Sequence, residues 1–333
     1  MNLSRFLFGT PVVAAVGLAM GAGVALAQDI RFNHAQGEIT LDSAPQRIAV
    51  FDLPSLDIIN ALGKSDLVVA VPRPADGPAN FPDHLALYDD ARFAPAGTLF
   101  EPDAEALQAI GPDLIILGGR SRTAFEAMGE IAPTIDMTIQ GDDRAADVIA
   151  DTERLGSLLG AEDAAATRIE AFRQTIAETR EAGAEAGTGL VLFGAGQGFS
   201  VQAPGARFGT VYELVGIEPV VSPVEPDTSP RPEPGSPEAE AARQRQNEAL
   251  EAALAANPDW IFTLDRNAAV GNSDADPLTD RLAADPRVTA TNAWQSGQVV
   301  ALDARNWYIL NGGIDAMSAS AEAIGAAFAA AAQ

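Results

Sequence analysis

One internal repeat constrains the fold of this chain more than any other feature of its sequence. Residues 105–120 read EALQAIGPDLIILGGR and residues 251–266 read EAALAANPDWIFTLDR, so both follow Glu, six residues, Pro-Asp, six residues, Arg. Each copy predicts a helix, a turn at Pro-Asp, a buried strand and an arginine just beyond that strand. Two copies predict two similar lobes, although a match this short could also arise by chance.

Short apolar runs bounded by turn residues occur along the whole chain and predict buried strands. They lie at residues 47–51, 67–71, 114–117, 190–193, 260–264 and 299–302. Helical patterns lie between them, at residues 55–62, 103–110 and 247–256. This alternation predicts an α/β protein with mostly parallel sheets, arranged as two Rossmann-like lobes.

Residues 143–182 form a long polar stretch of helical pattern with one interruption near Gly160, and they lie where a connector between lobes would be. The stretch from Ser222 to Pro237 is acidic and rich in proline, which predicts a loop. We therefore expect a division of the chain into five parts: a signal peptide at 1–27, an N-terminal lobe at 28–150, a connecting helix at 151–185, a C-terminal lobe at 186–311 and a C-terminal helix at 312–333.

The first residues have the layout of a secretory signal peptide. Arg5 precedes an apolar run from Phe6 to Leu26, and Ala25-Leu26-Ala27 predicts cleavage before Gln28. A membrane anchor is the alternative, but several glycines and a proline in the run weaken it. The chain has no cysteine, so it offers no thiolate ligand, no disulfide and no site for lipid attachment. We expect a periplasmic protein that is not a lipoprotein and has no stable membrane insertion.

The charge balance excludes two classes of partner. The 46 acidic and 21 basic residues give a net charge of −25, which would repel nucleic acid and anionic membranes. GC-rich codon usage together with a salt-adapted acidic surface explains most of this composition. Lys64 is the only lysine, so the other basic residues are arginines, whose planar guanidinium groups form several directed hydrogen bonds.

Three arginines occupy positions that suggest a ligand site. Open α/β sheets bind ligands at the carboxyl ends of their strands, where the repeat places Arg120 and Arg266. Arg207 precedes an apolar helical stretch, and a cation there opposes the helix dipole, so a bound anion would explain it. If the lobes face each other, these arginines line the cleft between them. Simple solvation in a loop is the alternative for each one.

The chain resembles the periplasmic ferric-siderophore and cobalamin binding proteins over nearly its whole mature length. The resemblance rests on the two Pro-Asp repeats, on Pro45–Val50 leading to Leu56–Gly63, and on the segment Asn306–Gly313. It implies the class III periplasmic binding protein architecture, with two lobes joined by one long helix and a ligand cleft between them. It also implies a monomeric binding protein, not an enzyme, that delivers its ligand to an ABC permease and its ATPase subunits.

Within that group the chain is most similar to the branch that binds catecholate siderophores such as petrobactin. The resemblance implies that Arg120, Arg207 and Arg266 surround anionic catecholate oxygens, with Trp307 and Tyr308 beside the ligand. It implies no intrinsic cofactor, because Fe³⁺ enters only as part of the siderophore. Tyr308 also matches a tyrosine that completes the iron shell in some members, but packing beside Trp307 explains it equally well.

The histidine that accompanies that tyrosine in the branch has no counterpart here. The only histidines are His34 and His84, both in the first lobe, and the loop expected to supply one, Ser222–Asn247, has none. This departure favours a siderophore that is already a complete chelate. The resemblance further implies that Glu105 and Glu251 dock the two lobes onto the permease, although a glutamate in the first turn of a helix is also favourable for local reasons.

Other functions have weaker support. Cobalamin or haem would use the same fold but would need a more aromatic pocket or one with histidine, and free zinc or manganese would need clustered histidines. The glycines at 194, 196 and 198 lack the spacing of a dinucleotide site, and no nucleophile elbow or phosphate-binding loop is present. A periplasmic hydrolase remains the distant alternative.

Overall fold

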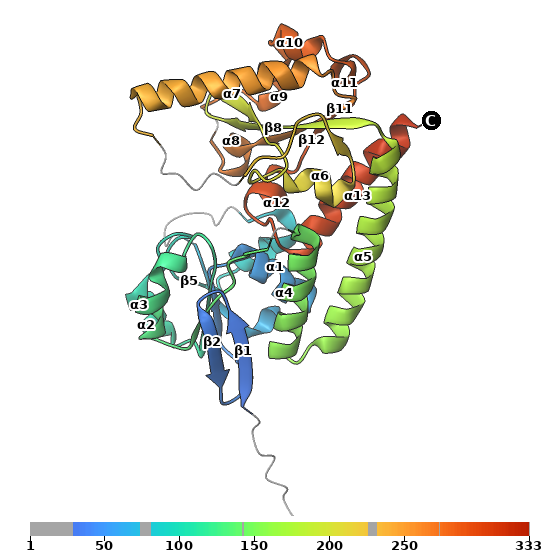
Figure 1. The fold of residues 1–333 in the computed structure, drawn as a ribbon. Helices are drawn as coiled ribbons and strands as arrows, with labels where there is room; N and C mark the ends of the chain where they lie inside the picture. Colours follow the sequence, from blue (N-terminus) through green and yellow to red (C-terminus); the bar gives the residue numbers. More distant parts are fainter. Residues whose placement is uncertain (1–28, 74–80, 142, 226–231, 273, 333) are drawn as a thin grey trace, which may run out of the picture.

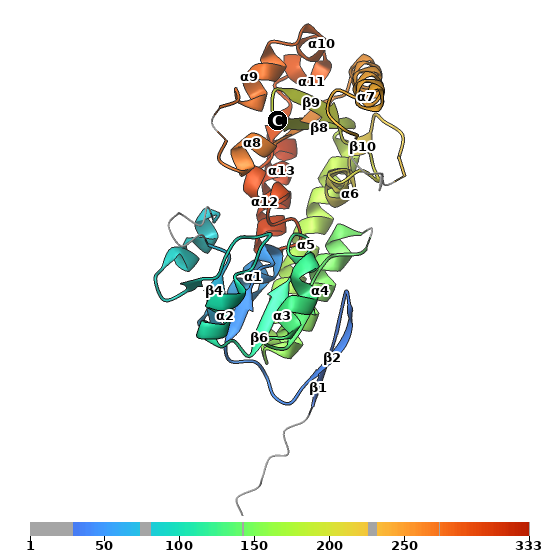
Figure 2. The same ribbon diagram turned by 90° about the vertical axis from the view of Figure 1, so that its left-hand side faces the viewer.

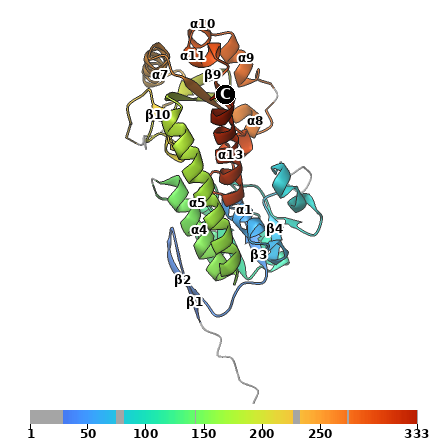
Figure 3. The same cartoon turned by 90° about the vertical axis from the view of Figure 1, so that its right-hand side faces the viewer.

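The computed structural model describes residues 29–73, 81–141, 143–225, 232–272 and 274–332. They form two α/β lobes, one above the other in Figure 1, connected by two long helices. Helix α5 (Glu162–Glu185) and helix α13 (Ile314–Ala331) pack against each other along one side of both lobes, as Figure 3 also shows. The expected signal peptide at 1–27 lies outside the described residues.

The N-terminal lobe is built on a parallel five-stranded sheet. Its strand order is β5-β4-β3-β6-β7, with an antiparallel hairpin of β1 and β2 set apart from it. The strands are β1 (Ile30–His34), β2 (Gly37–Leu41), β3 (Ile48–Val50), β4 (Val68–Val71), β5 (Ala94–Pro95), β6 (Leu114–Leu117) and β7 (Thr134–Asp136). The helices are α1 (Leu53–Ala61), α2 (Ala104–Ile110), α3 (Phe125–Gly129) and α4 (Arg144–Leu158), with short 3₁₀ turns at Ser65–Leu67, Asp83–Asp89 and Arg122–Ala124.

The C-terminal lobe repeats this plan with fewer parallel strands. Its sheet has the order β10-β8-β11-β12, all parallel, and β9 turns back antiparallel on β8. The strands are β8 (Thr188–Ala195), β9 (Gly198–Val201), β10 (Glu218–Pro219), β11 (Trp260–Asp265) and β12 (Val299–Ala301). The helices are α6 (Thr210–Val215), α7 (Pro237–Ala255), α8 (Arg266–Ala269), α9 (Leu278–Ala283), α10 (Pro286–Thr289), α11 (Asn292–Gln295) and α12 (Ala304–Tyr308).

The Pro-Asp repeat has the same structural role in both lobes. The Asp113 carboxylate, just before β6, accepts hydrogen bonds from the backbone N–H groups of Gln46 (2.8 Å) and Arg47 (2.9 Å), which lead into β3. The Asp259 carboxylate, just before β11, accepts from the N–H and the hydroxyl of Thr188, both at 2.9 Å, where β8 begins. Each aspartate therefore connects the strand of its repeat to the first parallel strand of its lobe. These hydrogen bonds help to fix the register between the two strands.

Two boundaries differ from the expectation. The expected interruption near Gly160 is present, since α4 ends at Leu158 and α5 begins at Glu162, so the connecting helix is α5 alone rather than all of 151–185. Gly160 lies between them with φ of +58°, a conformation that a helix interior does not allow. Helix α7 begins at Pro237 rather than near 247, so the second half of the expected loop Ser222–Asn247 is helical. The described part of the proline-rich stretch is irregular, while residues 226–231 lie outside the description.

One apolar core runs through both lobes. It includes Ile48 of the N-terminal sheet, Phe172 of α5, Phe262 of the C-terminal sheet and Met317 of α13, all essentially inaccessible to water. The lobes therefore share a packed core with the helices that join them. Among the described residues, no helix combines the length and the apolar character needed to cross a membrane.

Candidate functional site

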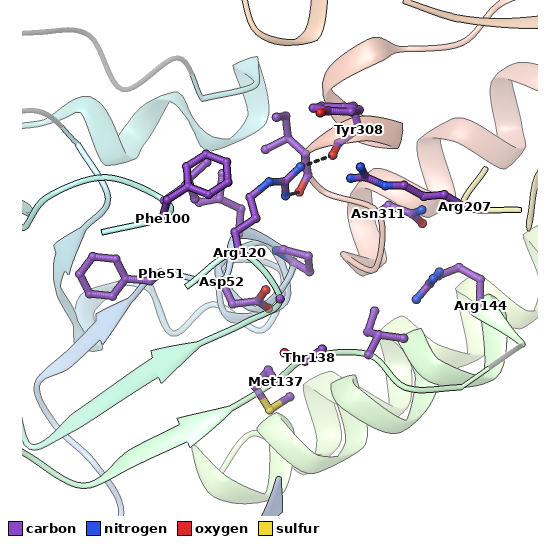
Figure 4. Close-up of a pocket in the computed structure, with 16 residues that line it drawn as sticks. Phe51, Asp52, Phe100, Arg120, Met137, Thr138, Arg144, Arg207, Tyr308 and Asn311 are labelled. Carbon is purple, nitrogen blue, oxygen red and sulfur yellow. Dashed lines mark hydrogen bonds between the residues drawn. The ribbon is translucent and has the colours of Figure 1, made fainter. Parts of the chain in front are cut away.

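A cavity of about 500 Å³ lies between the lobes. The N-terminal lobe lines it with residues that follow its strands, Asp52 after β3, Arg120 after β6 and Thr138 after β7. Arg207 and Tyr308 line it from the C-terminal lobe, as the close-up in Figure 4 shows. The carboxyl ends of the parallel strands thus form the cavity wall, as expected for an open α/β sheet.

The side chain of Tyr308 is surrounded by the three arginines that the sequence singled out. The guanidinium carbons of Arg207, Arg120 and Arg266 lie 4.8, 5.5 and 5.8 Å from the centre of its ring. Phe193 and Phe208 pack on the same ring, with centroid distances of 6.1 and 6.0 Å. Three positive charges from three separate segments therefore converge on one aromatic side chain.

Arg120 also links the two lobes. Its Nη2 donates to the backbone carbonyl of Tyr308 at 2.6 Å, and its Nη1 donates to that of Ile309 at 3.4 Å. Burial lowers the pKa of its guanidinium, and the nearby charge of Arg207 lowers it further. The remaining N–H groups of Arg120 are free to point at a ligand, because a guanidinium carries five donors.

Arg207 and Arg266 differ in their exposure to the cavity. Arg207 is exposed, lines the cavity and lies 4.8 Å from the ring of Phe208. Arg266, the first residue of α8, does not line the cavity, and its Nε donates to the Tyr308 hydroxyl at 3.0 Å. Arg266 therefore reaches the site through Tyr308.

The electrostatic environment of Tyr308 favours its ionised form. Burial raises the pKa of the phenol, but the hydrogen bond from Arg266 and the charges of Arg266, Arg207 and Arg120 together hold the pKa below its ordinary value. A phenol in such a field is a better acceptor for hydrogen bonds and a better metal ligand than an isolated tyrosine.

Trp307 does not lie where the sequence suggested. It is 1% exposed, belongs to the apolar core and is not among the residues that line the cavity. A helix of only five residues, α12, turns Trp307 inward and leaves its neighbour Tyr308 at the cavity. This placement does not fit the expected contact with a ligand, and it makes Trp307 a packing residue.

Asp52 is a cavity residue that the sequence reasoning missed. Its carboxylate caps α1, accepting from the Ser55 N–H at 3.0 Å and from the Ser55 hydroxyl at 2.6 Å. Burial raises its pKa to about 7, although the Ser55 hydrogen bonds and Arg120 act in the opposite direction. Asp52 lies two residues after the end of β3, as Arg120 lies three residues after the end of β6, so the rule that identified Arg120 could also have identified it.

Arg144 and Asn311 are two further polar residues that the sequence reasoning missed. Arg144 begins α4 and Asn311 follows α12, and both line the cavity. Figure 4 shows them on the side of the cavity away from Phe100. Nothing in the local sequence marks Arg144 as a site residue, since only the packing of α4 beneath the C-terminal lobe brings it there.

The described residues contain no cluster of three or more histidine, cysteine, aspartate or glutamate side chains able to hold a metal ion. His84 pairs with Asp57 at 2.6 Å, and His34 packs near the ring of Phe125, so neither histidine lines the cavity. Tyr308 is the cavity residue suited to ligate ferric iron, which would then be cargo rather than a resident cofactor.

A comparison of the sequence with known protein families matches residues 48–306 to the family described as "Periplasmic binding protein". The chain belongs to this family. The match spans the sheets of both lobes, the three arginines and α5. The resemblance seen in the sequence is thereby confirmed.

Relatives of this periplasmic binding protein are themselves binding proteins. The petrobactin-binding protein YclQ of Bacillus subtilis is 26% identical over 275 residues, which cover 82% of this chain and 80% of YclQ. Its crystal structure superimposes with a TM-score of 0.75 over 90% of this chain and 99% of that one. A TroA-like periplasmic binding protein from Xylanimonas cellulosilytica is 32% identical, with a TM-score of 0.75 and coverage of 91% and 98%. These structures confirm the predicted two-lobed α/β fold.

Glu105 and Glu251, the residues expected to dock on a permease, are exposed and lie one on each lobe. Figure 2 shows their helices, α2 below and α7 above. Glu105 lies in the first turn of α2, where the helix dipole favours it. Glu251 lies four residues before the end of α7, so the first-turn explanation does not apply to it, although Arg287 is close enough to interact with its charge.

Proposed function

We propose that this chain captures an anionic ferric siderophore of the catecholate type in the periplasm and delivers it to an ABC permease and its ATPase subunits for iron uptake. The convergence of Arg120, Arg207 and Arg266 on Tyr308 carries this proposal. The whole chain has a net charge of −25, so a concentration of guanidinium groups in the cavity requires a local reason. An anionic ligand supplies one.

The geometry suits a ferric tris-catecholate in particular. Such a complex carries three negative charges on oxygens distributed around the metal, and guanidinium groups form their strongest hydrogen bonds with anionic oxygens in a partly desolvated site. Arg120 and Arg207 line the cavity from different lobes, and Arg266 adds its charge through Tyr308, so an anionic ligand would meet positive charge from both lobes. The name of the relative YclQ gives petrobactin as that protein's own ligand.

We further propose that the iron reaches the cavity fully chelated. No histidine lies in the cavity to accompany Tyr308 as a second ligand. The Tyr308 hydroxyl already accepts a hydrogen bond from Arg266, so iron ligation would have to displace that bond. In this proposal Tyr308 orients the arginines and contacts the outer surface of the chelate.

Titration with a panel of metal chelates tests the ligand. The panel contains a ferric tris-catecholate, a ferric trihydroxamate, cobalamin and haem, and the signal is the fluorescence of Trp260, Trp294 and Trp307. We expect submicromolar binding of the tris-catecholate, weakened by Arg207→Ala by about 10- to 100-fold because a hydrogen bond between charged groups is lost. Binding of cobalamin or haem alone would keep the transport role but overturn the ligand.

Docking is a separate part of the proposal. We propose that the mature protein is monomeric, begins near Gln28 after signal cleavage, and contacts the permease through Glu105 and Glu251. Glu105→Arg and Glu251→Arg should each slow iron uptake by vesicles that contain the permease. Glu248→Arg, an exposed change on the same helix as Glu251, is the matched control. Unchanged uptake with both reversals would overturn the docking assignment.

A further inference from the structure

Arg144 is the cavity residue whose position has the least local explanation. It reaches the cavity from the first turn of α4, and Figure 4 shows it apart from Arg120 and Tyr308. A cation in the first turn of a helix opposes the helix dipole, so the helix gains nothing from it there. A neutral or acidic residue at this position would stabilise α4 more than an arginine does.

The guanidinium of Arg144 is buried without enough hydrogen-bond partners. Its side chain is 16% exposed, and its Nε and Nη1 have no hydrogen-bond acceptor among the described residues. Nη1 lies 3.6 Å from an Asp147 carboxylate oxygen, which gives an ion pair but is too long for a hydrogen bond. Burial lowers the pKa of Arg144, although Asp147, Asp151 and Glu213 act in the opposite direction. A buried charged donor left in this state destabilises the empty protein.

A second unsatisfied polar group lines the same cavity. The Oδ1 atom of Asn311 is buried and has no hydrogen-bond partner among the described residues. Asn311 comes from the C-terminal lobe and Arg144 from the N-terminal lobe, so a ligand that contacted both would bridge the lobes. Two residues that line the cavity, one from each lobe, therefore carry buried polar atoms without hydrogen-bond partners, beyond the groups around Tyr308.

We infer that Arg144 and Asn311 form a second subsite of the cavity, which binds an anionic oxygen of the chelate at Arg144 and an adjacent N–H or O–H group at Asn311. This inference rests on the proposed function of the cavity and narrows its ligand. A ferric chelate with a peripheral carboxylate or phenolate next to an amide or hydroxyl group meets both requirements. A chelate with a neutral periphery offers Arg144 no anionic oxygen. It therefore cannot offset the cost of desolvating this guanidinium group.

Arg144→Gln tests the subsite, with Arg173→Gln as the matched control. Both substitutions remove one positive charge, but Arg173 lies on α5 with its side chain 53% exposed and only a 3.8 Å ion pair to Glu153. The probes are a ferric tris-catecholate, ferric citrate with its free carboxylates, and a neutral ferric trihydroxamate. We expect Arg144→Gln to weaken the two anionic chelates by about 10- to 100-fold. The trihydroxamate should respond equally to both substitutions.

Thermal unfolding of the empty protein separates this role from a structural one. Because Arg144 is desolvated and underbonded, Arg144→Gln should leave Tm unchanged or raise it, whereas a structural arginine would lower Tm when replaced. Asn311→Leu should weaken the same chelates as Arg144→Gln. If the wild type binds an anionic chelate and Arg144→Gln binds it as tightly as Arg173→Gln does, the subsite is overturned and the proposed function stands. If the wild type binds no anionic chelate, the subsite and the proposed function are both overturned.

Discussion

The Nε of Arg266 donates a hydrogen bond of 3.0 Å to the hydroxyl of Tyr308, and this bond joins the end of β11 to the end of α12. Arg120 holds the other end of the same residue, because its Nη2 donates to the Tyr308 carbonyl at 2.6 Å. Tyr308 is thus held by one arginine from each lobe. Its ring is a fixed part of the cavity wall rather than a mobile side chain waiting for ligand.

Tyr308→Phe tests whether this hydroxyl ligates iron. The substitution keeps the ring and removes the acceptor of Arg266, so we expect affinity for a ferric tris-catecholate to fall by less than about tenfold, the effect of one hydrogen bond. The visible absorption band of the bound chelate should keep its position. A shift of that band relative to wild type would indicate that Tyr308 enters the iron coordination shell.

Arg120→Ala and Arg207→Ala should differ in their effect on stability. Arg120→Ala removes hydrogen bonds to two carbonyls and should lower the free energy of unfolding by about 1–3 kcal/mol. Arg207 is exposed, so Arg207→Ala should change the free energy by no more than about 0.5 kcal/mol. Urea unfolding followed by tryptophan fluorescence measures both. Equal destabilisation would contradict the role of Arg120 as a link between the lobes.

Affinity for an anionic chelate should decrease as pH rises through neutrality. Burial raises the pKa of Asp52 to about 7, so the carboxyl group in the cavity is mostly neutral at pH 6 and mostly ionised at pH 8. An ionised Asp52 repels an anionic ligand. Asp52→Asn should abolish this dependence while keeping α1 capped, because asparagine is also a good N-cap. Dissociation constants at the two pH values, measured for both proteins, decide the question.

The stability of the empty protein should fall between pH 4.5 and about 7. Burial raises the pKa of Glu213 from 4.5 to about 7, assisted by a hydrogen bond to Asp143, while Arg180 acts in the opposite direction. Because the folded state holds this proton more tightly than the unfolded chain does, raising the pH through this window removes stability. Glu213→Gln should flatten the curve of Tm against pH, and the exposed Glu218→Gln should not.

Ligand binding should move the lobes only slightly. Helices α5 and α13 both run along the two lobes, and one apolar core includes residues of the helices and of both sheets. We expect the radius of gyration to change by less than about 1 Å between empty and loaded protein, as measured by X-ray scattering. A contraction of several ångströms in the radius of gyration would contradict this expectation, because it would require the core shared by the two lobes to rearrange.

The sequence predicted the strands β3, β4, β6, β8, β11 and β12, and the cavity arginines Arg120 and Arg207, because these depend on local patterns. The runs at 114–117 and 260–264 are apolar, bounded by Pro-Asp and followed by arginine, and β6 and β11 lie there. The start of α7 was missed although Ser236 and Pro237 are a good N-cap and first residue for a helix, because the surrounding prolines suggested a loop.

The positions of other site residues could not be predicted, because they depend on packing between segments that are distant in the sequence. The side chains of Trp307 and Tyr308 are adjacent in the sequence, yet one lies in the core and the other at the cavity, according to how α12 packs. Arg144 reaches the cavity only because α4 packs against α1 of its own lobe and α6 of the other. Such placements depend on contacts between distant segments.

Helix α13 contacts α1 and α4 of the N-terminal lobe as well as α6 and α12 of the C-terminal lobe, and all of these elements precede it in the chain. The described elements before α13 are therefore synthesised before the core that the two lobes share can be completed. We expect the final packing of that core to wait for α13. Late completion of this kind suits a polypeptide that we propose is threaded across a membrane before it folds.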